Sequence, residues 1–156
     1  MAIFMTRSIP LLLLLGAMLG IAACDSPTRP SSGPQLPPPP AVEGDTVTTE
    51  SGLRYIEIEE GEGTPAARGH EVRVAYTLWL EDGTGIEQGT IPWFTLGSAN
   101  LIQGFTEGIV GMREGGRRRL LVPPELGYGA QGSGAVPPDA SLIFDVELLE
   151  RRTRSQ

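Results

Sequence analysis

Residues able to perform covalent or metal chemistry are scarce in this chain. Cys24 is the only cysteine and His70 the only histidine among the 156 residues. A Ser-His-Asp or Cys-His arrangement would need that histidine, and a Cys/His metal cluster cannot be assembled. No loop has the regular spacing of acidic residues that a calcium site needs. We therefore expect no metal, no cofactor and no intramolecular disulfide, and the common nucleophilic and zinc chemistries lose support.

A glycine- and proline-rich loop followed by an alternating strand is the most informative stretch. It reads PPELGYGAQGSGAVPPDASLIFDVELLE at 123–150. Tyr128 lies in the loop, where no core periodicity accounts for an aromatic residue. Phe144 lies in the strand and shares its parity with other apolar residues. A loop of this length within a compact domain is usually either a binding element or disordered, and composition alone leaves both open.

The charge of the chain argues against a nucleic-acid partner. The formal net charge is −7 and there is no lysine, whereas nucleic-acid binding relies on clustered cations. The one basic cluster, Arg117 to Arg119, lies in a strand-like segment whose alternation would divide it between two faces. We interpret this cluster mainly as a solvent-exposed strand edge.

Residues 1–23 have the features of an export signal. Arg7 provides a positive start, and Ile9 to Leu19 provide an apolar run too short for a dependable membrane-spanning helix. Small residues then precede Cys24, and this ending resembles a bacterial lipobox. The resemblance implies cleavage before Cys24 and attachment to a membrane through lipid on that residue. The alternative is an ordinary secretory signal with an incidental cysteine. The anchored form would belong to the bacterial cell envelope, facing the periplasm or the exterior.

A proline-rich segment follows the signal. Residues 24–48 include Pro37–Pro40, four consecutive prolines that favour polyproline II and prevent a packed core. We expect a disordered, semi-rigid tether, and the alternative is a ligand for a proline-recognising module. The folded domain is expected at 49–152, followed by a short tail at 153–156.

The domain alternates between strand patterns and one helical pattern. Leu101 to Met112 is the only plausible helix, with Asn100 as a candidate N-cap. Its three glycines weaken it but would allow a sheet to approach closely. Pro92 restricts its own strand to an edge or a strand start. Strands are predicted at 53–58, 72–80, 91–97, 117–122 and 141–149. This order predicts an α+β domain with a mainly antiparallel sheet.

Four motifs occur in the order, and near the spacing, of a known family. They read SGLRYIEIEEGEG at 51–63, VAYTLWLEDGT at 74–84, FTLGSANLIQGFTEGIVGMREGGRRRLLVPPELGYGAQG at 94–132 and AVPPDASLIFDVELL at 135–149. With these motifs, residues 51–151 resemble the FKBP-type peptidyl-prolyl isomerases. The resemblance implies a bent antiparallel β-sheet wrapped around one short α-helix, with an apolar pocket between them.

The resemblance also implies which residues form the site. Tyr128 would hold a substrate carbonyl through its hydroxyl, Phe144 would close the pocket floor, and Glu87 would bias the twist of the bond. These three are the expected catalytic residues. The substrate-binding residues implied by the resemblance are Tyr76, Ile86, Phe94, Leu101, Ile102, Phe105, Tyr128, Val136 and Phe144. Considered without the resemblance, aromatic residues on alternating strands are more often core residues than ligand contacts.

Several positions depart from the family pattern. Ile86 and Glu87 stand where an aromatic residue and an aspartate are usual, and Phe105 stands where a tryptophan is usual. Pro92 takes the place of a further aromatic residue, with Trp93 beside it as a candidate spatial replacement. These departures bear on substrate preference, macrolide affinity and rate more than on the fold.

Prolyl isomerisation suits a chain with so few reactive side chains. Rotation about an X-Pro bond is opposed by a resonance barrier of about 18–20 kcal/mol, and no bond has to be broken. An apolar pocket favours the twisted amide, which has lost the charge separation of the planar form. We expect a monomeric isomerase acting on proline-containing exported polypeptides, with a macrolide as a further candidate ligand. A non-catalytic polypeptide-binding module of the same fold is the alternative.

Overall fold

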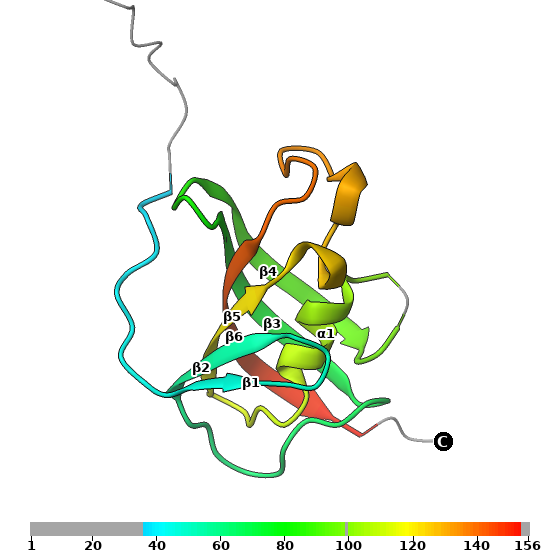
Figure 1. Ribbon diagram of the computed structural model, residues 1–156. Coiled ribbons are helices and arrows are strands. Elements are labelled where there is room, and N and C mark those ends of the chain that lie inside the picture. Colours follow the sequence, from blue (N-terminus) through cyan, green and yellow to red (C-terminus); the bar gives the residue numbers. More distant parts are fainter. Residues whose placement is uncertain (1–35, 99, 154–156) are drawn as a thin grey trace, which may run out of the picture. The chain divides into compact units, whose positions relative to one another are not determined.

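Six antiparallel strands form one sheet, and a short α-helix packs against one face of it (Figure 1). This computed structural model describes residues 36–98 and 100–153. The strands are β1 (Thr46–Thr48), β2 (Arg54–Glu59), β3 (Glu71–Leu80), β4 (Gly85–Thr95), β5 (Arg117–Val122) and β6 (Leu142–Arg152), and the helix is α1 (Gln103–Ile109). The spatial order is β1-β2-β5-β6-β3-β4. The predicted α+β class and bent antiparallel sheet are confirmed.

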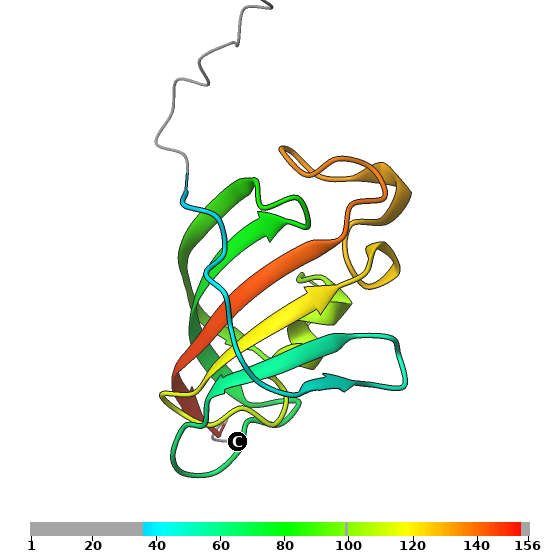
Figure 2. The ribbon, with the colours of Figure 1, turned by 60° about the vertical axis from the view of Figure 1, so that its left-hand side comes forward.

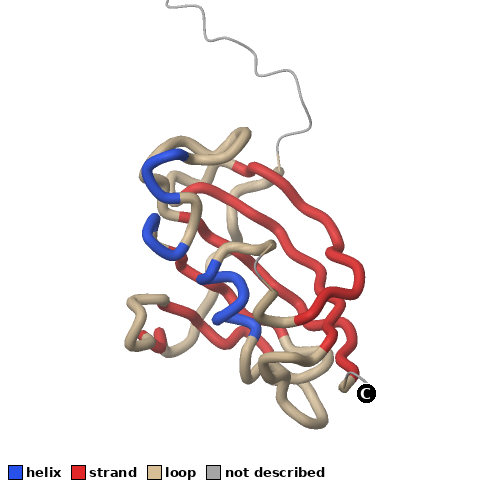
Figure 3. The backbone as a smooth tube through the Cα atoms, turned by 90° about the vertical axis from the view of Figure 1, so that its right-hand side faces the viewer, coloured by secondary structure: helices blue, strands red, loops and turns tan. Residues whose placement is uncertain are grey.

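Alternation along the strands creates one apolar face. In β6, the residues from Leu142 to Leu148 alternate between buried and half-buried, and the buried set includes Phe144. This face packs against α1 (Figure 3). The pairing register breaks within β3 and its partners, and such breaks bend a strand locally. The strand containing Pro92 is longer than predicted but does lie at a sheet edge, as β4.

The helix is shorter than the sequence predicted. It begins after Ile102, whose backbone is extended, and no side chain caps it, so the predicted N-cap role of Asn100 is wrong. Two of its glycines are needed for packing. A Cβ on Gly104 would lie 2.5 Å from Val122 Cγ1, and one on Gly108 would lie 2.4 Å from Leu120 Cδ1. Close approach of α1 to β5 therefore depends on glycine, as the sequence indicated.

Gly108→Ala should lower the free energy of unfolding by about 1–3 kcal/mol, because the new methyl collides with the buried Leu120 side chain. Urea unfolding measures this change. The double variant Gly108→Ala/Leu120→Val should lose less than the sum of its two single variants, because valine lacks the colliding atoms. Stabilisation by Gly108→Ala, as helix propensity alone would give, would contradict this packing.

Only Arg117 of the arginine cluster is solvent-exposed as we predicted, and the strand that carries the cluster is not an edge strand. β5 lies between β2 and β6, and Arg118 and Arg119 are only 7% and 6% exposed. Arg118 donates to Glu57 and to the carbonyl of Gly108 near the end of α1. Arg119 forms a bidentate ion pair with Asp145 on β6. Each charge is buried because a carboxylate on a neighbouring strand pairs with it.

The sheet also begins earlier than the predicted boundary at residue 49. β1 pairs with β2, so the start of the domain falls within the predicted tether. Upstream of β1, the carbonyls of Pro37 and Pro40 accept hydrogen bonds from Trp79 and Arg119. Residues 36–48 therefore lie against the domain. The predicted signal, Cys24 and the rest of the predicted tether lie outside the described residues. Within the described residues, no helix is long and apolar enough to cross a membrane.

Candidate active site

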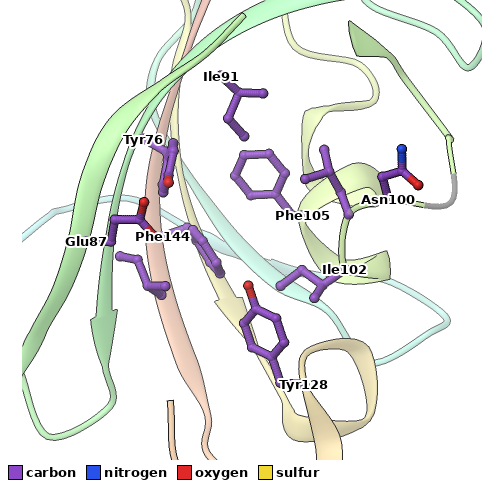
Figure 4. Close-up of a pocket in the computed structure, with 10 residues that line it drawn as sticks. Tyr76, Glu87, Ile91, Asn100, Ile102, Phe105, Tyr128 and Phe144 are labelled. Carbon is purple, nitrogen blue, oxygen red and sulfur yellow. The ribbon is translucent and has the colours of Figure 1, made fainter. Parts of the chain in front are cut away.

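A cavity of about 320 Å³ opens between the sheet and the start of α1 (Figure 4). Strands β3, β4 and β6 supply one side, and the helix supplies the other. The loop after β5 closes one end. The cavity is lined by Tyr76, Leu78, Glu87, Ile91, Asn100, Leu101, Ile102, Phe105, Tyr128 and Phe144.

Three aromatic rings from three elements pack together at the cavity. Phe105 of α1 and Phe144 of β6 have ring centroids 5.2 Å apart, and Tyr76 of β3 lies 6.0 Å from Phe105. Tyr76 and Phe105 meet edge to face, at an interplanar angle of 80°. This arrangement of aromatic rings is favourable. Phe105 and Phe144 are almost fully buried, so they form a rigid apolar wall.

The loop holding Tyr128 is ordered by its own backbone. It contains two short 3₁₀ turns, η1 (Pro124–Leu126) and η2 (Gly129–Gln131), which flank the tyrosine. The amide of Asp139 donates to the carbonyl of Gly129 and ties the far end of the loop back to the turn. Tyr128 is 37% exposed, and its hydroxyl points into the cavity (Figure 4). Of the two interpretations left open for this loop, the structure supports a binding element.

Glu87 brings a negative charge to the cavity. It lies opposite Leu78 in the β3–β4 pairing, and its carboxylate approaches the Tyr76 ring (Figure 4). Burial, followed by hydrogen bonding to Glu87 and the charge of that carboxylate, raises the pKa of Tyr76 to about 12. Like an ordinary tyrosine, Tyr76 is protonated at physiological pH, so its hydroxyl can donate to Glu87. The acid and the phenol form a polar pair on an otherwise apolar wall.

Glu87→Gln should lower the pKa of Tyr76 part of the way toward its ordinary value of about 10, since burial, the largest cause, remains. In the wild type, the raised pKa contributes stability that is fully present below about pH 10 and is lost as the pH rises toward 12. Tyrosinate absorbance during an alkaline titration measures the shift, and Tyr76→Phe identifies the signal. An unchanged titration in Glu87→Gln would contradict this pairing.

Seven of the ten predicted site residues lie on the cavity. They are Tyr76, Glu87, Leu101, Ile102, Phe105, Tyr128 and Phe144. Ile86, Phe94 and Val136 do not line it. Phe94 pairs with Val72, farther along β3 than the cavity, and Val136 is 5% exposed and packs into the core. Ile86 falls at a break in the β3–β4 register and packs against the core.

Three cavity residues had not been predicted. Leu78 shares the parity of Tyr76 along β3, so the alternation contained a signal for it. Ile91 of β4 pairs with Val74 and lines the cavity. Asn100 lies at the rim before α1 and had no signal beyond its position in the chain. Trp93 does not replace the missing aromatic, since it is 37% exposed and stacks with the Arg152 guanidinium 4.2 Å from its ring centroid.

The arrangement suits recognition of a small apolar group attached to a polar chain. A concave apolar cavity with a few polar groups at its rim is typical of such sites. Here the rim groups include the Tyr128 hydroxyl and the Glu87 carboxylate. Within residues 36–98 and 100–153, no three His, Cys, Asp or Glu side chains are grouped as metal ligands.

Comparison with known proteins agrees with this class of site. The profile of the family described as "FKBP-type peptidyl-prolyl cis-trans isomerase" matches residues 62–149. An "FK506-binding protein" of Neisseria meningitidis serogroup B is 47% identical over 104 residues, which cover 64% of this chain and 95% of the relative. The crystal structure of FkpA from Escherichia coli superposes with a TM-score of 0.65 at 34% identity, covering 71% of this chain and 53% of that one. The structure of AtFKBP13 gives 0.64 at 30% identity, covering 69% and 99%.

The chain belongs to the FKBP-type peptidyl-prolyl cis-trans isomerase family, whose members catalyse rotation about the peptide bond before proline. The site explains why no nucleophile is required. The reaction changes only a dihedral angle, so positioning and an apolar environment can supply the catalysis.

Proposed function

We propose that this isomerase acts on exported polypeptides while it is anchored to a membrane of the cell envelope through lipid on Cys24. The support is the sequence of residues 1–24, with its positive start, short apolar run and lipobox-like ending. An isomerase held at a membrane would meet polypeptides as they emerge unfolded, when prolyl bonds are still isomerising.

The observation that carries the catalytic mechanism is the Tyr128 hydroxyl facing an aromatic wall across the cavity. The substrate proline ring packs against Phe105 and Phe144. The Tyr128 hydroxyl donates a hydrogen bond to a substrate carbonyl and fixes the chain on one side of the rotating bond. Twisting removes the resonance of the amide and the charge separation that goes with it. An apolar wall therefore favours the twisted amide over the planar one.

Glu87 and Tyr76 act together in this proposal. The protonated Tyr76 hydroxyl donates a hydrogen bond to the Glu87 carboxylate. The pair holds the Tyr76 ring against Phe105 and places a negative charge at the edge of the cavity, where it biases the twisting amide. Glu87 therefore takes the role that the family resemblance gives to its acid, one methylene farther from the backbone.

The same cavity is the proposed site for a macrolide. Several relatives are named FK506-binding proteins. An apolar macrolide ring would displace the substrate proline from the aromatic wall, so FK506 should inhibit the reaction competitively. We propose that the protein works as a monomer, since its cavity is formed by residues of one chain.

Cys24→Ser should move the protein from the membrane fraction to the soluble fraction of the cells that export it. Lipid anchoring requires the cysteine sulfur, whereas a secretory signal does not. Fractionation with an antibody to the folded domain measures the change. Ser26→Ala, two residues away, is the matched control and should leave the protein membrane-bound. Unchanged membrane attachment of Cys24→Ser would refute the anchor.

Refolding of an exported protein with a rate-limiting prolyl bond tests the substrate class. The wild type should shorten the slow phase, and FK506 should abolish the effect. A slow phase that the wild type leaves unchanged would refute the proposed action on such chains.

A further inference from the structure

The outer face of the sheet, turned away from α1, is covered by a segment with the periodicity of polyproline II. We call residues 36–42, sequence LPPPPAV, the strap. Leu36, Pro39 and Val42 are half-buried, and the residues between them are exposed. Polyproline II has three residues per turn, so this pattern means that one ridge of the strap faces the sheet. Figure 2 shows the strap (blue to cyan) crossing the strands.

The sheet binds the strap through carbonyls that are also one turn apart. Trp79 Nε1 donates to the carbonyl of Pro37 at 2.7 Å, and Arg119 Nη1 donates to that of Pro40 at 2.6 Å. Polyproline II makes no internal hydrogen bonds, so its carbonyls are free to accept. An aromatic residue beside an extended proline-rich segment is the usual arrangement where folded domains recognise such segments.

The surface beneath the strap is built from residues of β3, β4 and β5. Arg119 is held by its ion pair with Asp145, and its guanidinium lies 6.0 Å from the Trp79 ring centroid. Gly85 leaves room for Leu36, because a Cβ there would lie 2.4 Å from Leu36 Cβ. Trp79 is 4% exposed although it is not part of the apolar core on the inner face. Its neighbour Leu78 lines the catalytic cavity, so the two surfaces lie on opposite faces of β3.

We propose that this outer face is a polyproline II-binding site, occupied in cis by the strap, which accepts a proline-rich segment of another polypeptide when the strap is displaced. The two hydrogen bonds use only backbone carbonyls, which any such segment presents. A groove of about 410 Å³ borders Pro40 and is lined in part by Trp79, Gln88 and Glu147. The protein then carries two proline-recognising sites, one catalytic and one for docking.

The test uses the full chain with Pro37–Pro40 all replaced by serine, which we call the strap variant. The probe is a blocked peptide with the sequence of residues 35–42, QLPPPPAV, titrated by calorimetry. The strap variant should bind one peptide per chain at the outer face, in addition to peptide bound in the catalytic cavity. At the outer face, the wild type should bind at least about tenfold more weakly, because the strap competes at an effective concentration on the order of millimolar. A peptide with serine in place of proline should not bind.

Four further substitutions in the strap variant locate the binding. Trp79→Phe should abolish it, whereas Trp93→Phe, the matched change on the exposed β4 edge, should leave it intact. Gly85→Ala should weaken it, and a peptide with glycine in place of leucine should restore it in part, because the shortest contact is to Leu36 Cβ at 2.4 Å, whereas the backbone O and Cα of Leu36 lie 3.2 and 3.3 Å away. This rescue does not depend on how well Trp79→Phe folds. The proposal would be overturned if the strap variant did not bind the peptide, or if the wild type bound it equally well. It would also be overturned if binding were lost in Phe144→Leu but kept in Trp79→Phe.

Discussion

Phe144→Ala should reduce kcat/KM for prolyl isomerisation by at least about tenfold and lower the free energy of unfolding by about 3–5 kcal/mol. Phe144 is 4% exposed, contacts the Phe105 ring and lines the cavity, so its removal both opens the core and deletes the wall that receives the proline. Isomerisation of a proline peptide measures the first effect and urea unfolding the second. The activity assay must be run where the variant is still folded.

A second truncation on the same strand separates catalysis from stability. Leu148 is fully buried on the same face of β6 but does not line the cavity. Leu148→Ala should lose about 2–5 kcal/mol of stability yet keep nearly wild-type kcat/KM while folded. Phe144→Leu should lose less stability than Phe144→Ala but still lose activity, because it keeps volume without the ring. Equal loss of kcat/KM in Leu148→Ala and Phe144→Ala would assign the whole effect to the core.

Asp145→Leu should lower the free energy of unfolding by about 3–5 kcal/mol, because it leaves the Arg119 charge buried without its partner. The side chains of Arg119 and Asp145 are only 7% and 13% exposed, so water cannot replace the lost carboxylate. Urea unfolding measures the loss. The effect arises on the outer face of the sheet, so the rate of isomerisation by the folded fraction should change little.

The double variant Arg119→Met/Asp145→Leu should recover most of this loss, since no charge then remains buried. It should still lack the hydrogen bond from Arg119 to the strap, at a cost of about 1 kcal/mol. Glu150→Leu is the matched control on the same strand. Its ion pair with Arg73 is 40–49% exposed, and its loss should cost less than about 1 kcal/mol. A double variant as unstable as Asp145→Leu would show that the buried charge is not the cause.

Periodicity in the sequence predicted most of the elements that hold the site, but not the first half of β4, which carries Glu87. Alternation predicted the strands of Tyr76 and Phe144, and their parity put both on the face that packs against α1. The parity of a residue along its strand no longer predicts which side chains reach the cavity where the strand register breaks. Breaks in the β3–β4 register occur beside Ile86 and near Phe94, and neither side chain reaches the cavity. A register break has no signature in one sequence, because it depends on which residue the partner strand presents.

Partners distant in sequence account for the other differences. Arg119 reads as a surface residue until Asp145, on another strand, is placed beside it. Pro37–Pro40 read as a free tether until Trp79 and Arg119 supply donors for the carbonyls. In both cases a residue is held in place by hydrogen bonds to a partner distant in sequence, and composition cannot reveal that pairing.

The most direct test compares two tyrosine-to-phenylalanine changes in the isomerisation assay. Tyr128 presents its hydroxyl to the cavity, whereas Tyr55 on β2 lies under the Arg118 guanidinium and outside it. The wild type should accelerate isomerisation of a proline peptide. Tyr128→Phe should lower kcat/KM about two- to twelvefold, the value of one hydrogen bond, and Tyr55→Phe should leave it unchanged. No acceleration by the wild type, or equal rates for the two variants, would contradict the assignment of this cavity as the isomerase site.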